Sequence, residues 1–214
     1  MLVDMHLHEC TYSSDSKISL EEIVTTARGR GLDAVCITDH DSMGLREYAA
    51  EYSDRTGFPI FVGIEFFSLQ GDITAWGIED YPGCRVDAQD FINHVNEAGG
   101  FCVSCHPFRN NNRGLEENLR AVKGLHGVKG LHGVEVLNGS TALEANRRAF
   151  SYCRELGLKT IGASDAHTMG QIGKYATWLP EKVDCLKDFV EQLKTRQVRP
   201  AVWNGSSYDV VDML

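Results

Sequence analysis

Histidine and carboxylate side chains recur at the ends of apolar, strand-like segments of this sequence. His6 and His8 stand two residues apart, so that on a β-strand both imidazoles point to the same face. A single His-x-His pair is a weak indication of a metal site, because it is equally typical of a partly exposed strand. The pair gains weight because similarly placed residues follow it, namely Asp15, His40, Glu65, His106, Asp165 and His167. Imidazole and carboxylate ligands without thiolate favour Mn, Fe or Zn, and this number predicts two or three divalent metal ions.

The framework that must position these side chains can be predicted from the pattern of apolar residues. Short apolar segments alternate with amphipathic ones, which predicts an α/β fold with parallel strand pairs and a site at the carboxyl ends of the strands. Several strands are too uniformly apolar to have a solvent-exposed face. The predicted strands are Leu2–Leu7, Ala34–Thr38, Pro59–Glu65, Ile73–Ile78, Phe101–Cys105, Gly133–Leu137, Thr160–Ala163 and Pro200–Trp203.

Four predicted helices lie between these strands. Ser19 and Glu22 form a capping-box pattern ahead of the first of them, and each helix carries one apolar stripe. The stripes run over residues 20–27, 88–95, 142–153 and 183–193. The number of alternating units allows either a barrel or an open doubly wound sheet.

Composition and charge limit the classes of function. The chain has 214 residues, of which 43% are hydrophobic, and no linker-like stretch divides it, so we expect a single domain over residues 1–214. A net charge of -9 disfavours tight, charge-driven binding to nucleic acid or anionic lipid. With neither a membrane-spanning run nor a signal-peptide pattern, and with an odd number of cysteines, we expect a cytoplasmic protein with reduced thiols.

Taken together, the motifs resemble those of the PHP (polymerase and histidinol phosphatase) family. They occur in the family's order and cover nearly the whole chain, so the resemblance is far more specific than any one motif. The matching segments are DMHLH at 4–8 with Ser14-Asp15, ITDHDSMG at 37–44, GIE at 63–65, CHP at 105–107, VEVLN at 134–138 and GASDAH at 162–167. The resemblance implies a distorted (β/α)7 barrel with metals at the carboxyl ends of the strands, and metal-dependent phosphoester hydrolysis.

The resemblance also implies how the ligands are shared between metal ions. His6, His8, Glu65 and Asp165 would bind one ion, Asp15, His40 and His167 a second, and His106 would help to hold a third. In the family's trinuclear pattern a further histidine follows the Glu65 motif, and in this sequence we place Thr74 at that position. A threonine hydroxyl is a poor ligand beside imidazole. The sequence between Glu65 and His106 is too short to contain an inserted subdomain, so we expect an open pocket.

We therefore predict an enzyme that hydrolyses a small phosphomonoester, of the nucleotide or 3′,5′-bisphosphate type, with hydroxide activated by the metal ions. Arg109 is the candidate for contacting the phosphate oxygens, although a solvated loop arginine is the alternative. The proton for the leaving group could come from His40, His167 or a metal-bound water. Asn138 lies near the expected site, with Glu135, and is a second candidate for contact with the substrate.

Three other functions remain open at the level of sequence. The first is exonuclease-like trimming of short nucleic-acid ends, and the second is a histidinol-phosphate-type phosphatase. The third is a non-catalytic, metal-bound module that binds a nucleotide. The expected partners are a small phosphorylated substrate and the phosphate product, and we expect no association with a membrane.

Overall fold

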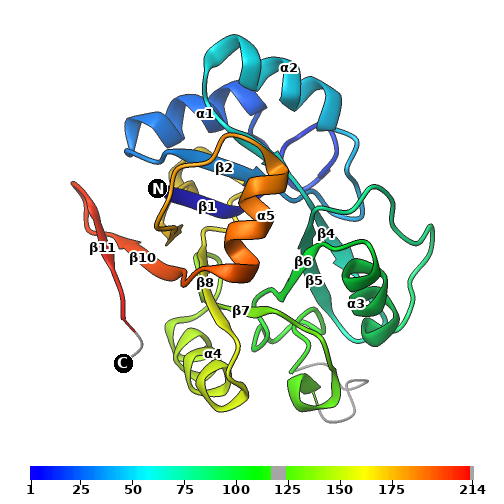
Figure 1. Cartoon of the computed structure of the whole chain (residues 1–214). Helices are drawn as coiled ribbons and strands as arrows, with labels where there is room; N and C mark the ends of the chain where they lie inside the picture. The colour runs from blue at the N-terminus through cyan, green and yellow to red at the C-terminus, as the bar shows by residue number, and fades with distance from the viewer. Residues whose placement is uncertain (117–123, 213–214) are drawn as a thin grey trace.

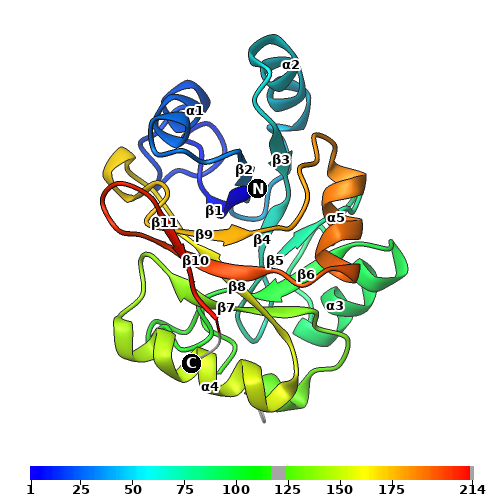
Figure 2. The same ribbon diagram turned by 60° about the vertical axis from the view of Figure 1, so that its left-hand side comes forward.

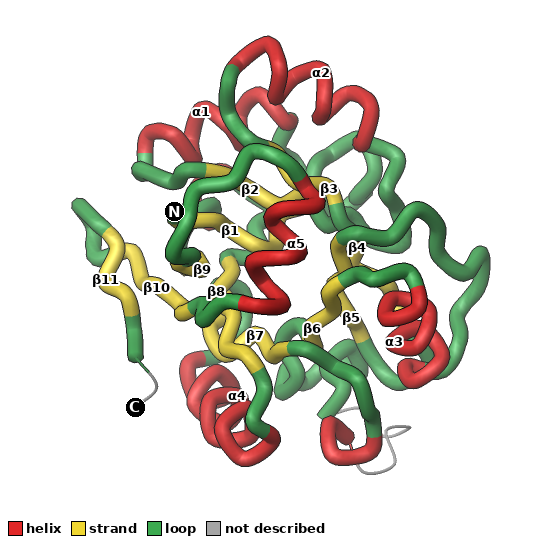
Figure 3. Tube along the Cα trace, viewed as in Figure 1, coloured by secondary structure: helices red, strands yellow, loops and turns green. Residues whose placement is uncertain are grey.

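The computed structural model describes residues 1–116 and 124–212 and contains two β-sheets with helices packed around them (Figure 1). The six-stranded sheet has the order β11-β10-β9-β1-β2-β3, and the five-stranded sheet has the order β4-β5-β6-β7-β8. Figure 3 shows helices above, below and to the right of the strands. The strands are β1 Leu2–Leu7, β2 Ala34–Ile37, β3 Ile60–Val62, β4 Ile64–Phe67, β5 Asp72–Trp76, β6 Phe101–Ser104, β7 Gly133–Asn138, β8 Lys159–Ala163, β9 Tyr175–Trp178, β10 Arg199–Trp203 and β11 Tyr208–Val210.

The pairing confirms an α/β fold, but the expected (β/α)7 barrel is not confirmed. Strands β1, β2 and β3 pair in parallel, as do β6, β7 and β8. Strand β5 runs antiparallel to both of its neighbours, and β9, β10 and β11 form an antiparallel extension beside β1. The strands of the described residues therefore form two sheets of mixed direction and no closed barrel.

The division between the sheets falls at Gly63, inside the segment that we expected to be one strand over Pro59–Glu65. Strand β3 ends before Gly63 and pairs with β2, whereas β4 begins after it and pairs with β5. A Cβ atom at Gly63 would collide with the carbonyl oxygen of Ala75 and the ring of Trp76. Only glycine allows this close approach of backbone to backbone.

The two sheets meet at the carboxyl ends of their strands. Isolated parallel bridges join His40 to Glu65 and Leu7 to Ala166. The backbone N–H of Glu65 donates to the carbonyl oxygen of Asp39 (3.2 Å). In the same way, the N–H of Asp165 donates to the carbonyl oxygen of His6 (2.8 Å). We call this junction the seam, defined by these four backbone pairs, and the residues predicted to bind metal lie along it.

Five α-helices among the described residues cover the sheets, with α1 and α2 on one side and α4 on the other (Figure 2). They are α1 Leu20–Gly29, α2 Arg46–Thr56, α3 Ala88–Glu97, α4 Leu143–Leu156 and α5 Leu186–Thr195. The capping box at the start of α1 is confirmed, since Ser19 Oγ accepts from the Glu22 N–H and the Glu22 side chain accepts from the Ser19 N–H. None of these helices is long and apolar enough to cross a membrane.

Candidate metal centre

Several of the predicted ligands lie at the ends of strands, where the backbone turns sharply. His8 directly follows β1, and His106 and Asp165 come within two residues of the ends of β6 and β8. His106 (φ 32°) and Asp165 (φ 51°) both adopt the left-handed region that non-glycine residues rarely occupy. Each strand end is therefore turned so that its side chain faces the seam, and backbone strain of this kind concentrates at functional sites.

At the centre of the cluster, two imidazoles and a carboxylate face one point. Nε2 of His6 and Nε2 of His8 are 3.0 Å apart, and Oδ1 of Asp165 lies 3.7 Å from the first and 3.4 Å from the second. Oε2 of Glu65 is 3.5 Å from Nε2 of His6. All four side chains are buried. His6, His8 and Asp165 form one of the groups whose ligand atoms are close enough to hold a metal ion.

A second group lies nearer to solvent. His8, His40 and His167 offer ring nitrogens that lie within 4.8 Å of one another. Oδ2 of Asp15 is 3.1 Å from Nε2 of His40 and 3.4 Å from Nε2 of His167. Nδ1 of His40 is 2.7 Å from Oε2 of Glu65, so the second group borders the first. Seven of the eight predicted ligands thus lie in these two groups at the seam.

A third group contains a residue that we did not predict, Asp72. Glu65, Asp72 and His106 offer ligand atoms within 4.8 Å of one another, and His106 Nε2 lies 2.8 Å from Oε1 of Glu65 and 3.8 Å from Oδ2 of Asp72. Thr74, which we placed at the position of the missing histidine, is two residues further along β5 and pairs with Glu65. Asp72 therefore brings a carboxylate to the place where we expected no strong ligand.

The donor set fits divalent metal ions. Glu65 Oε2 lies 2.7 Å from Nδ1 of His40 and Asp72 Oδ2 lies 3.1 Å from Nε of Arg113, whereas the buried Oδ1 of Asp72 accepts no hydrogen bond from the described residues. Buried carboxylates without such bonds are costly unless a cation or a proton compensates them. Mixed imidazole and oxygen donors are typical of Mn, Fe and Zn sites. The donor set is therefore that of a metal centre.

The pKa values in the cluster follow from burial and from opposing charges. Burial alone would raise the pKa of Glu65, but His6 and hydrogen bonds from His106 and His40 hold it well below its ordinary value. Burial and the neighbouring Glu65 raise the pKa of Asp72 well above its ordinary value. Burial lowers the pKa of His8 to about 4, which favours the neutral imidazole that a metal ion requires.

Arg109 and Asn138 lie beside the central group. The Arg109 guanidinium donates through Nη2 to Oδ2 of Asp165 and to Oδ1 of Asn138 (3.0 Å). Asn138 Nδ2 donates to Oε2 of Glu135 (2.8 Å). Nδ1 of His6 lies 2.7 Å from Oε1 of Glu135, so Glu135 orients the ring and leaves Nε2 facing the centre.

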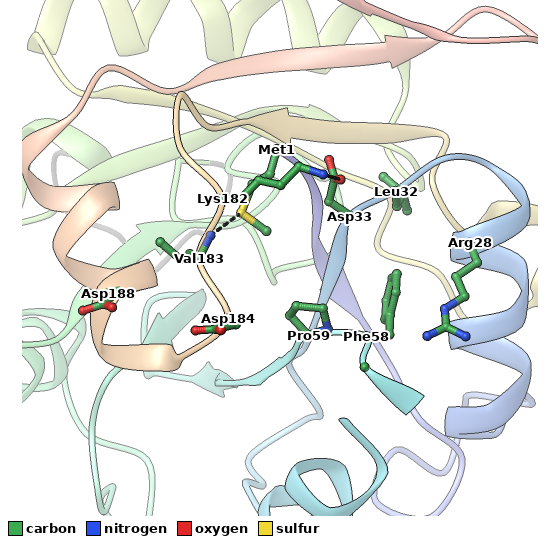
Figure 4. A pocket seen from close by; sticks show the side chains of 11 residues that line it. Met1, Arg28, Leu32, Asp33, Phe58, Pro59, Lys182, Val183, Asp184 and Asp188 are labelled. Carbon is green, nitrogen blue, oxygen red and sulfur yellow. Dashed lines mark hydrogen bonds and ion pairs between the residues drawn. The ribbon is translucent and has the colours of Figure 1, made fainter. Parts of the chain in front are cut away.

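Another cavity, of about 530 Å³, lies at the amino end of β1 and contains none of the predicted site residues (Figure 4). Two of its charged groups are already engaged, since Lys182 Nζ is 2.6 Å from Oδ1 of Asp33 and the Met1 amino group donates to the carbonyl oxygen of Leu179 (2.6 Å). The Arg28 guanidinium stacks over the Phe58 ring. This cavity therefore offers no cluster of catalytic groups.

The α/β fold and the histidine and carboxylate cluster define a metal-dependent hydrolase. The chain belongs to the PHP family, because the PHP domain model matches residues 4–142, and that of the PHP-associated region matches residues 144–198.

Comparison with known proteins finds one of related sequence and others of similar fold. An uncharacterized protein of Methanocaldococcus jannaschii, MJ1587, is 27% identical over 119 residues, which cover 50% of this chain and 68% of that protein. A Bifidobacterium adolescentis protein proposed to be a metal-dependent phosphoesterase has a similar fold (TM-score 0.65, 18% identity, 78% of this chain and 88% of the other). So does a lesion-specific endonuclease of Pyrococcus furiosus (TM-score 0.69, 13% identity, 92% of this chain and 57% of the other).

Proposed function

We propose that the protein is a metal-dependent phosphoesterase that hydrolyses a small phosphomonoester of the nucleotide or 3′,5′-bisphosphate type. One observation carries the proposal. The ligand atoms of His6, His8 and Asp165 are close enough together to hold a metal ion, and the Arg109 guanidinium donates a hydrogen bond to Asp165 beside them. Phosphoryl transfer needs positive charge on both sides of the transferring group, and this arrangement supplies a cation site and a guanidinium together.

We assign the ligands of the metal ions as the sequence predicts, with Asp72 added. His6, His8, Glu65 and Asp165 hold one ion, Asp15, His40 and His167 a second, and Glu65, Asp72 and His106 a third. Divalent ions bound there would lower the pKa of water and neutralise charge on the phosphoryl oxygens. Manganese, iron and zinc all suit these donors.

The chain's own residues then orient the substrate and move protons. Arg109, a planar donor fixed by Asn138, faces the phosphoryl oxygens. His40 and His167 have side chains that are 25% and 22% exposed, which leaves them accessible to a leaving group at the outer edge of the cluster. Whichever of the two rings is not coordinated to the second ion could hold the proton that the leaving oxygen takes up. We propose that residues 1–214 act as one domain in this reaction, because β1 of the PHP region pairs with β9 of the PHP-associated region.

Phosphate release by the metal-loaded protein tests the proposal. The substrates are nucleoside monophosphates, 3′,5′-bisphosphates, histidinol phosphate and short oligonucleotides, each with and without a chelator. We expect chelator-sensitive hydrolysis of a small phosphomonoester, and at least about a hundredfold loss in Asp165→Asn, which removes a charged ligand. The exposed Asp80→Asn is the matched control and should keep full activity.

Two results would contradict the proposal. Hydrolysis of oligonucleotides alone would favour trimming of nucleic-acid ends, and its rate should then fall steeply with salt. Protein that holds metal but releases no phosphate from any of these substrates would favour a nucleotide-binding role.

A further inference from the structure

The hydroxyl group of Ser13 lies between a ligand of the candidate metal centre and a buried carboxylate. Ser13 Oγ donates to Oδ1 of Asp39 (2.8 Å), and Nδ1 of His8 lies 3.1 Å from the same Oγ atom. The backbone N–H of His40 donates to Ser13 Oγ as well (3.2 Å). Asp39, Ser13 and His8 are all buried, so these bonds are shielded from bulk water. We call these three side chains the Asp39–Ser13–His8 triad.

The direction of each bond in the triad follows from the chemistry of the groups. A carboxylate can only accept, so the single hydrogen of the Ser13 hydroxyl goes to Asp39. The backbone N–H of His40 can only donate, and it occupies one lone pair of Ser13 Oγ. The other lone pair faces Nδ1 of His8, so the network assigns a hydrogen to Nδ1. In a neutral imidazole Nε2 then offers a free lone pair, which is what a metal ion requires.

Backbone hydrogen bonds hold the triad in this position. Oδ1 of Asp39 also accepts from the Glu9 N–H (2.7 Å), and the Ser13 N–H donates to the carbonyl oxygen of Glu9 (3.0 Å). The carbonyl oxygen of Asp39 accepts from the Glu65 N–H at the seam. The distance between the Asp39 carboxylate and the Ser13 hydroxyl is therefore fixed from both sides.

Two carboxylates of the metal centre favour the opposite placement of the hydrogen. Oε2 of Glu65 and Oδ1 of Asp165 each lie 3.4 Å from Nε2 of His8, so a hydrogen on Nε2 would face them. That hydrogen would block the nitrogen from a metal ion. Both contacts are longer than ordinary N–H to oxygen hydrogen bonds, whereas the 3.1 Å between Nδ1 and Ser13 lies within their range. The bond to Ser13 therefore decides which nitrogen carries the hydrogen.

We propose that Asp39 and Ser13 are positioning residues that hold His8 in the tautomer that binds metal. Asp39 does not belong to any group of described residues that could hold a metal ion, and it acts on His8 only through the Ser13 hydroxyl. Glu135 orients the ring of His6 by direct contact, whereas for His8 the direction of the intervening hydroxyl depends on Asp39. The proposal rests on the metal ions of the proposed function, but its tests do not use hydrolysis, so either can fail without the other.

NMR of the ring nitrogens in the metal-free full chain tests the tautomer. Long-range ¹H–¹⁵N spectra distinguish a nitrogen that carries a hydrogen from one that does not, and His8→Gln identifies the signals of His8. We expect the hydrogen on Nδ1 in the wild type. In Asp39→Ala the Ser13 hydroxyl can turn and donate to Nδ1, so the hydrogen should move to Nε2. A hydrogen on Nε2 in the wild type, or on Nδ1 in both proteins, would overturn the proposal.

Titration with Zn²⁺ alone gives a second test, which stands even where Asp39→Ala does not fold. Ser13→Ala removes the acceptor for Nδ1 and should weaken Zn²⁺ binding by about 10- to 100-fold. Asp39→Asn keeps an oxygen toward Ser13 and Glu9 and should retain both the tautomer and most of the affinity. Ser53→Ala is the matched control, because the Ser53 hydroxyl of α2 donates to the carbonyl oxygen of Phe58 (2.9 Å), and it should bind Zn²⁺ as the wild type does. Equal affinity in Ser13→Ala and the wild type would overturn the proposal.

Discussion

Asp72 gives the third group of the candidate centre a carboxylate where the family resemblance led us to expect a histidine replaced by Thr74. Both residues lie on one face of β5, because they are two positions apart on a strand. Asp72 contributes a carboxylate to a group that could hold metal, with Glu65 and His106. The chemistry of the position is therefore changed, from imidazole to carboxylate, rather than lost. Oxygen donors shift the preference of a site toward Mn over Zn.

Asp72→Asn should weaken binding of one metal ion by about 10- to 100-fold, because it removes a buried charge beside Glu65 without changing size. Thr74→Val is the matched control on the same strand and should keep the metal content. Elemental analysis after dialysis against Mn²⁺ measures both variants. A loss of metal in Thr74→Val, with none in Asp72→Asn, would return the third position to residue 74.

His132 provides a pH-dependent contribution to stability far from the metal centre, at the amino end of β7. Burial, with Lys194 nearby, lowers its pKa below 6.5, and its Nδ1 accepts a hydrogen bond from the Cys102 N–H (3.2 Å). The unfolded chain thus binds a proton at pH values where the folded chain does not, so stability falls as pH drops through 6.5. His132→Asn keeps an acceptor but should show a smaller fall between pH 7.5 and 5.5. Urea unfolding at both pH values measures the difference, and an identical pH dependence in both proteins would contradict it.

At the scale of elements, the sequence pattern predicts most strands well, because strands such as β2 and β6 are buried on both faces and consist almost entirely of apolar residues. Helix α2 could not be predicted in this way, since only Ala49 and Tyr52 are buried and the helix lacks an apolar stripe. Strand β9 was missed because its four residues, with two aromatic ends, carry too little periodicity. Most of the predicted ligands were proposed because they lie at or just beyond the ends of predicted strands, whereas Asp72 opens its strand and gave no such signal.

Gly63→Ala tests how the bend between β3 and β4 positions Glu65. The added methyl group has no space beside Ala75 and Trp76, so the strands must shift. We expect a loss of about 1–3 kcal/mol in the free energy of unfolding, as for other overpacked cores, together with weaker metal binding because Glu65 moves. Gly83→Ala is the control, since a Cβ at Gly83 meets no atom within 4 Å. Unfolding by urea and metal titration of both variants measure these effects, and an unchanged Gly63→Ala protein would show that the bend does not need glycine.

At the scale of the whole molecule, the candidate ligands come from both sheets, so metal binding should stabilise the entire fold. His6, His8 and His40 belong to the six-stranded side, and Glu65, His106 and Asp165 to the five-stranded side. Without cations, buried carboxylates such as Glu65 and Asp72 face each other across a short distance.

We therefore expect Mn²⁺ at 100 times its dissociation constant to raise the free energy of unfolding by about 2.7 kcal/mol. A chelator should reverse the gain. Thermal unfolding measures it, and Asp165→Asn should show a smaller gain than the wild type. A midpoint that does not respond to Mn²⁺, in protein shown to bind it, would mean that the unfolded chain binds the ions as tightly as the folded chain does.

The seam also limits how members of the family can exchange segments. A crossover at Gly63 would bring His6, His8 and His40 from one parent and Glu65, His106 and Asp165 from the other. Neither parent would then contribute a complete set of donors for the central ion. Recombinants should thus keep function only when the strand ends of both parents place the donor atoms at the same positions. We therefore expect the two halves of the chain to be inherited as one unit.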